Sequence, residues 1–81
     1  MIPVEEITAT CRAVAAVLRK RRESLGLTKT AVAQRAGINN QTVTFIEDCV
    51  NIPTIHTLLR FCWALDTTPE AVFKEAKKTI K

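Results

Sequence analysis

The amino-acid sequence predicts an all-α protein, a single compact domain of five helices over residues 1–81. Residues that favour helices dominate, tyrosine is absent, and no stretch alternates strictly between apolar and polar side chains as a half-buried strand does. A hydrophobic content of 47% with 25% charged residues is typical of a folded globular chain and excludes a disordered one. Each helix can be placed from its apolar spacing and from the residues at its ends.

The first helix is expected over about residues 7–24, with its start between Pro3 and Thr8. Proline suits the first position of a helix, and Glu5 and Glu6 suit the positive end of the helix dipole. Gly26 ends the helix. One stripe at helical spacing is expected to face the core, formed by Ile7, Cys11, Val14, Ala15, Leu18 and Leu25.

Two short helices joined by a tight turn are expected at residues 28–36 and 39–48. Thr28 and Asn39 have the side chains that cap helix N-termini, and Gly37 suits the left-handed residue that ends the first of the two. Counting Lys29 as position one, Ala33 is fifth and Gly37 ninth: the small residue lets the helices cross closely, and the glycine sets their angle. The inward positions are taken by Val32, Ala36, Ile38, Val43 and Ile46.

This spacing indicates a helix-turn-helix, a motif that presents its second helix to the major groove of DNA. An ordinary pair of antiparallel helices is the alternative, but it would not require these residues at these offsets. Arg22 lies four residues after Leu18 and so on the buried side of the first helix, where an arginine needs an acidic partner. Glu47, near the end of the second motif helix, is the expected partner.

The last two helices are expected at residues 54–65 and 68–77, capped by Thr54 and Thr68, with Pro69 at a first helical position. Phe61 is expected beside the inward stripe of the fourth helix, and Trp63 to point away from it. Trp63 is either a partly exposed residue lying on a neighbouring helix or an anchor, with Phe73 of the fifth helix, in a dimer interface. The residues expected to face inward are Ile55, Leu58, Leu59, Cys62, Leu65, Val72, Phe73 and Ala76.

The composition and the residue pattern argue against a metalloprotein, an enzyme and a membrane-spanning protein. Three scattered cysteines and one histidine do not form a metal site, and we interpret Cys11, Cys49 and Cys62 as buried reduced thiols. We expect no cofactor and no enzymatic activity, because no nucleophile with a base, no paired carboxylates and no phosphate-binding glycine loop is present. No apolar run is long enough to span a membrane. A net charge of +4 agrees weakly with a polyanionic partner.

Most of the chain between about Val14 and Phe73 resembles the lambda-repressor/Cro-type helix-turn-helix family, also called the XRE family. The resemblance is carried, in order and without a gap, by Arg22, Gly26-Leu27-Thr28, Val32-Ala33, Gly37-Ile38, Val43, Ile46-Glu47, Pro53, Leu58 and Ala64-Leu65. It implies a five-helix lambda-repressor-like fold with a buried Arg22–Glu47 ion pair. It also implies a cytoplasmic, nucleoid-associated regulator of bacterial or phage type that binds double-stranded DNA as a homodimer on a pseudo-palindromic operator.

The resemblance also assigns DNA contacts to individual residues. Gln41 can hydrogen-bond adenine through both amide groups, and Phe45 can contact a thymine methyl. By resemblance, the residues that read bases are Asn40, Gln41, Thr44 and Phe45, and those that contact phosphate are Thr28, Lys29, Asn39 and Thr42.

One segment departs from the family pattern. Residues 48–50, Asp-Cys-Val, stand where the family usually has a basic or amide residue, then glycine, then lysine or arginine, and no lysine or arginine occurs between Arg35 and Arg60. Two interpretations stay open. In the first, Lys29, Arg35 and the basic end of the first helix hold DNA, with a shallow salt dependence. In the second, Phe45 and Val50 form an apolar patch for a protein partner, as in an antitoxin-like module with weak or lost DNA binding.

Overall fold

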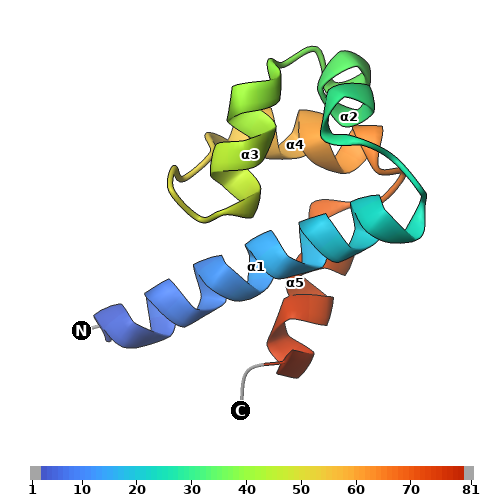
Figure 1. Ribbon diagram of the computed structural model, residues 1–81. Coiled ribbons are helices and arrows are strands. Elements are labelled where there is room, and N and C mark those ends of the chain that lie inside the picture. The colour runs from blue at the N-terminus through green and yellow to red at the C-terminus, as the bar shows by residue number, and fades with distance from the viewer. Residues whose placement is uncertain (1–2, 80–81) are drawn as a thin grey trace.

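Five α-helices make up the computed structural model, which describes residues 3–79, and no strand occurs in that range. They are α1 (Val4–Ser24), α2 (Lys29–Ala36), α3 (Asn40–Glu47), α4 (Ile55–Ala64) and α5 (Pro69–Thr79). α1 is the longest and runs beneath the group formed by α2, α3 and α4, while α5 turns back against α1 (Figure 1). The predicted all-α class with five helices is confirmed.

α1 begins at Val4, within the expected interval between Pro3 and Thr8, and Pro3 lies before it in an extended conformation as the N-cap. Two members of the expected inward stripe are exposed instead: Ile7, with 48% of its surface accessible, and Leu25. Ile7 belongs to the N-terminal turns, which extend beyond the other helices (Figure 1). Leu25 is the C-cap residue, beyond the last helical turn, so the helical spacing no longer directs its side chain inward.

The core lies where α1, α2, α3 and α4 meet, with α5 packed against α1. Small residues allow these helices to approach closely, as expected for Ala33 at the crossing of α2 and α3. Ile38 is half-buried and packs on this core. The buried cluster consists of Leu18, Val32, Ala33, Ala36, Val43, Ile46, Phe61, Cys62, Ala64, Leu65 and Val72.

The orientation of α4 differs from the sequence expectation. Phe61 is fully buried rather than placed beside the inward stripe, whereas Ile55 and Leu59 are 78% and 49% exposed. Both rows fit a helical repeat, and packing against α2 and α5 selects the face that carries Phe61 and Leu65. Trp63 points away from the core as expected and is 73% exposed.

Arginines from neighbouring helices satisfy the free carbonyl groups at two helix ends. Arg21 of α1 donates from Nε to the Leu65 carbonyl at 3.0 Å, and Arg35 of α2 donates to the Ala64 carbonyl at 3.3 Å, both at the end of α4. Arg60 of α4 donates to the carbonyl of Gly37 at 3.3 Å, at the end of α2. Gly37 has a positive φ of 70°, so a residue with a side chain would be strained there, and its Cβ would also displace an Arg60 nitrogen that lies 2.8 Å away.

Candidate nucleic-acid interface

Two capped helix starts define the helix-turn-helix. Thr28 Oγ1 accepts a hydrogen bond from the Ala31 amide at 3.0 Å at the start of α2. Asn39 Oδ1 accepts from the Thr42 amide at 2.7 Å at the start of α3. These caps satisfy amides that the first turn of a helix leaves free, and they fix where each helix begins. Thr28 and Asn39 are therefore occupied as caps, and their exposed positions leave only part of each side chain for a phosphate.

α3 has one buried face and one accessible face. Val43, Ile46 and Glu47 are buried, while the four residues assigned to base reading lie on the same short helix with unequal accessibility. Asn40 and Gln41, in the first turn, are exposed, and Thr44 and Phe45 are half-buried. The first turn is thus the part of α3 most accessible to a ligand.

A hydrogen bond between the two motif helices fixes Asn40. Its Nδ2 donates to Thr30 Oγ1 of α2 at 2.9 Å. Thr42 Oγ1 likewise donates to Asn39 Oδ1 at 2.8 Å, so the threonine assigned to a phosphate is held by the cap beside it. Sequence reasoning missed Thr30, although a hydroxyl in the first turn of α2 was the available signal. Gln41 has no such partner among the side-chain hydrogen bonds of residues 3–79, and its amide is the group most free to form new ones.

The ion pair expected from the sequence is present between α1 and the end of α3. Arg22 Nε donates to Glu47 Oε2 at 2.6 Å, and Arg22 also donates from one terminal nitrogen to Glu47 Oε1 at 3.0 Å. Its other terminal nitrogen donates to the Leu27 carbonyl at 2.9 Å. The hydrogen bond that Arg22 donates to the Glu47 carboxylate raises the pKa of the Arg22 guanidinium above its ordinary value, so the guanidinium stays charged. It fixes α3 relative to α1.

The turn after α3 keeps a left-handed residue although it lacks the glycine. Cys49 has φ +59° and is exposed, so it is not the buried thiol that the sequence indicated. The Val50 amide donates to the Phe45 carbonyl at 2.9 Å and closes the turn. Val50 is exposed but Phe45 is half-buried, so the expected apolar patch consists mainly of Val50. Cys62 is the buried thiol, and its burial raises its pKa; Cys11 is half-buried.

α3 itself contains no lysine or arginine. Arg35 is bonded to the end of α4, and Arg19 pairs with Glu23 at 3.5 Å. Lys29, at the N-terminus of α2, makes no salt bridge or side-chain hydrogen bond with any residue in the 3–79 range. Because the positive end of the α2 dipole adds to its charge, Lys29 is the best placed basic residue for a phosphate next to α3.

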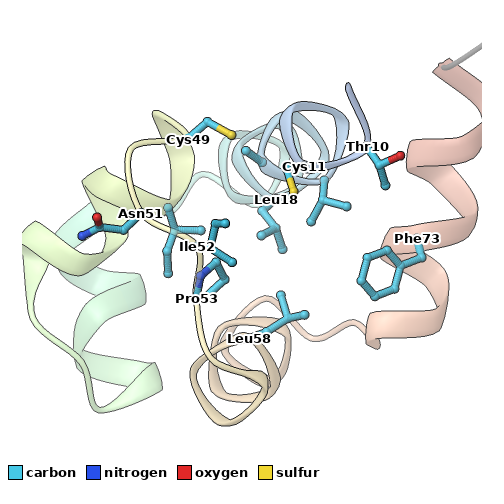
Figure 2. A pocket seen from close by; sticks show the side chains of 12 residues that line it. Thr10, Cys11, Leu18, Cys49, Asn51, Ile52, Pro53, Leu58 and Phe73 are labelled. Carbon is cyan, nitrogen blue, oxygen red and sulfur yellow. The ribbon is translucent and has the colours of Figure 1, made fainter. Parts of the chain in front are cut away.

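An apolar groove of about 200 Å³ lies on another part of the molecule, between α1, the loop before α4, α4 and α5 (Figure 2). Phe73 lines this groove opposite Ile52 and Leu58, and it is 41% exposed rather than buried as expected. Trp63 lines a different hollow, with Arg35 and Asp66. The structure therefore places Trp63 and Phe73 on separate surfaces and does not bring them together in one.

Within residues 3–79, no helix combines the length and apolar character needed to cross a bilayer. In the same range, no three side chains of histidine, cysteine, aspartate or glutamate come together as metal ligands would.

Comparison with known proteins gives a consistent result. The helix-turn-helix domain family matches residues 13–73, and no curated protein matches the chain. The fold is similar to that of the wild-type restriction-modification controller protein C.Esp1396I, with 22% identity over 85% of this chain and 90% of that chain and a TM-score of 0.78. It is also similar to the clp gene regulator ClgR from Corynebacterium glutamicum, with 22% identity over 89% of this chain and 94% of that chain and a TM-score of 0.81.

Proposed function

This chain belongs to the helix-turn-helix domain family, and from that premise we propose that it is a sequence-specific DNA-binding regulator of transcription. The observation that carries the proposal is the accessible first turn of α3, where Asn40 and Gln41 are exposed beside the capped start of α2. Amide side chains in this position suit hydrogen bonding to base edges in the major groove.

The proposed contacts divide by role. Gln41 reads a base pair, with adenine as the preferred partner because an amide can bond both N6 and N7. Asn40 is held by Thr30 and offers its oxygen and remaining N–H to a base or phosphate. Thr44 and Phe45 contribute short-range contacts from half-buried positions, and Lys29 with the amides at the start of α2 holds a phosphate. Thr28, Asn39 and Thr42 support this phosphate contact through the caps.

We further propose that the chain acts as a homodimer on a pseudo-palindromic operator and represses transcription by occupying it. Two structures with a similar fold are described as a restriction-modification controller and a gene regulator, which supports a regulatory role. A dimer also provides more phosphate contacts than a single chain can make. With one well-placed lysine per chain, a single copy has little electrostatic affinity, and two copies on one duplex double the number of phosphate contacts.

Selection of bound sequences from a randomised duplex pool at low salt tests the proposal. Enrichment of two related half-sites about one helical turn apart is expected. The matched control is a variant with Asn40→Ala and Gln41→Ala, which alters the accessible turn and leaves the core intact. This variant should no longer enrich the sequence that the natural chain selects. Failure of the natural chain to enrich any sequence or to bind duplex at low salt would reject DNA binding and favour a protein partner.

A further inference from the structure

α4 carries a second apolar row that the fold does not use. Ile55, Leu59 and Trp63 follow one another at intervals of four residues, and they are 78%, 49% and 73% exposed. Residues four apart lie nearly above one another on a helix, so these side chains form a continuous row on one side of α4. The buried face of the same helix, with Phe61, Cys62 and Leu65, points elsewhere, into the core.

The size of the row is notable for so small a protein. From ordinary side-chain areas its three members expose roughly 400 Å², which is comparable with the largest apolar patch of a typical monomer, and such patches are often functional. The whole described surface is only 5707 Å². Trp63 dominates the row, and exposed tryptophan is enriched at the centre of protein interfaces.

We propose that this row, Ile55, Leu59 and Trp63, is the surface through which a second copy of the chain pairs with the first. The row has Leu59 at its middle and another apolar residue four positions away on each side, Ile55 before it and Trp63 after it. When two α4 helices pack antiparallel about a two-fold axis at Leu59, each Leu59 meets its counterpart and each Ile55 meets the other copy's Trp63. A symmetric interface needs a surface that complements itself in this way.

The residues around the row are compatible with a second copy of the chain. A shallow hollow of about 310 Å³ lies at the Trp63 end, lined by Arg35, Trp63, Ala64 and Asp66, and receives the Ile55 side chain of the second copy. His56 and Arg60 lie along the same exposed side of α4 and supply a polar margin. A stable interface buries about 800 Å² per partner, so the apolar row provides about half of that area and the proposal requires the polar side chains around it to supply the rest.

The pairing uses this side of α4 together with the hollow beside Trp63, and the groove lined by Phe73 takes no part in it. It deepens the proposed function, because a two-fold protein is what a pseudo-palindromic operator requires. It can nevertheless be measured without DNA, so the two proposals fail separately.

Sedimentation of two matched arginine variants tests the interface. Leu59→Arg places two like charges at the axis and should convert the dimer to monomer, weakening association at least 100-fold. Ile7→Arg is the control, since Ile7 is equally exposed, at 48%, but lies on α1. It should remain dimeric. Circular dichroism of both variants should stay close to that of the natural chain, because neither position is in the core.

The alternatives give distinct results. A natural chain that sediments as a monomer at high micromolar concentration, a dimeric Leu59→Arg variant, or a monomeric Ile7→Arg variant would each overturn the α4 interface. Mild oxidation gives a second measurement: with Cys49→Ser as background, Leu59→Cys should form a covalent dimer and Ile7→Cys should not. If Leu59→Arg is monomeric yet still binds a single half-site at low salt, both proposals stand. If the natural chain pairs through α4 but binds no duplex, the DNA-binding proposal alone falls.

Discussion

Glu47 is a buried carboxylate, 7% exposed, whose charge is matched by Arg22 at 2.6 Å. Glu47→Ala leaves the largely buried Arg22 guanidinium without its acidic partner. We expect this variant to lose about 3–5 kcal/mol in the free energy of unfolding. Urea denaturation measures this loss. Glu23→Ala removes the exposed partner of Arg19 and should cost less than about 0.5 kcal/mol. Similar small losses in both variants would show that the buried pair does not stabilise the fold.

Gln41 is the exposed amide in the first turn of α3. Gln41→Ala should reduce discrimination at one base pair of each half-site by about 1–3 kcal/mol while leaving non-specific affinity unchanged. Binding to a panel of single-base operator variants measures this. Lys29→Ala is the contrasting variant, since the loss of a phosphate contact weakens binding to all sequences alike. A uniform loss for Gln41→Ala would assign Gln41 to the backbone instead.

At the scale of elements, the turn after α3 holds Cys49 at φ +59°. A left-handed conformation costs a residue with a side chain about 1 kcal/mol relative to glycine, so Cys49→Gly should stabilise the protein by about that amount, less the entropy that glycine adds to the unfolded chain. Thermal denaturation measures the gain. Cys49→Ser removes the thiol but keeps the Cβ, and its melting temperature should not rise. Equal stabilisation by both variants would point to the thiol rather than to the backbone.

The helices themselves could be predicted from local signals, because Thr28, Asn39, Thr54 and Thr68 each cap a helix as their residue types indicate. The Arg22–Glu47 pair was predictable from helical spacing alone. The orientation of α4 was not, because apolar residues occur on two of its sides and only packing decides which side is buried. For the same reason, the exposed row of Ile55, Leu59 and Trp63 could not be predicted. The Asn40–Thr30 hydrogen bond could not be predicted either, because it depends on the angle between α2 and α3, which residue spacing does not give.

At the scale of the whole molecule, only part of the net charge of +4 is available to contact DNA phosphates near α3. Arg21, Arg35 and Arg60 bond helix ends, and no lysine or arginine lies within α3. We therefore expect one lysine–phosphate contact per chain, through Lys29, and a slope of about −2 for the dimer in a plot of log binding constant against log salt concentration. Fluorescence anisotropy at several salt concentrations measures the slope. Lys29→Ala should make it shallower by about two, and a slope near −10 for the natural chain would contradict this count.

The arginines at the helix ends also have a consequence for how the molecule opens. Arg35 of α2 and Arg21 of α1 both donate hydrogen bonds to carbonyl groups at the end of α4. Arg60 of α4 donates to a carbonyl group at the end of α2. Because of these bonds, neither α2 nor α4 can unwind at its C-terminal end without breaking a hydrogen bond to a neighbouring helix. The amide protons of α2 and the second half of α4 should therefore exchange with deuterium together, at a rate set by opening of the whole domain rather than by local fraying.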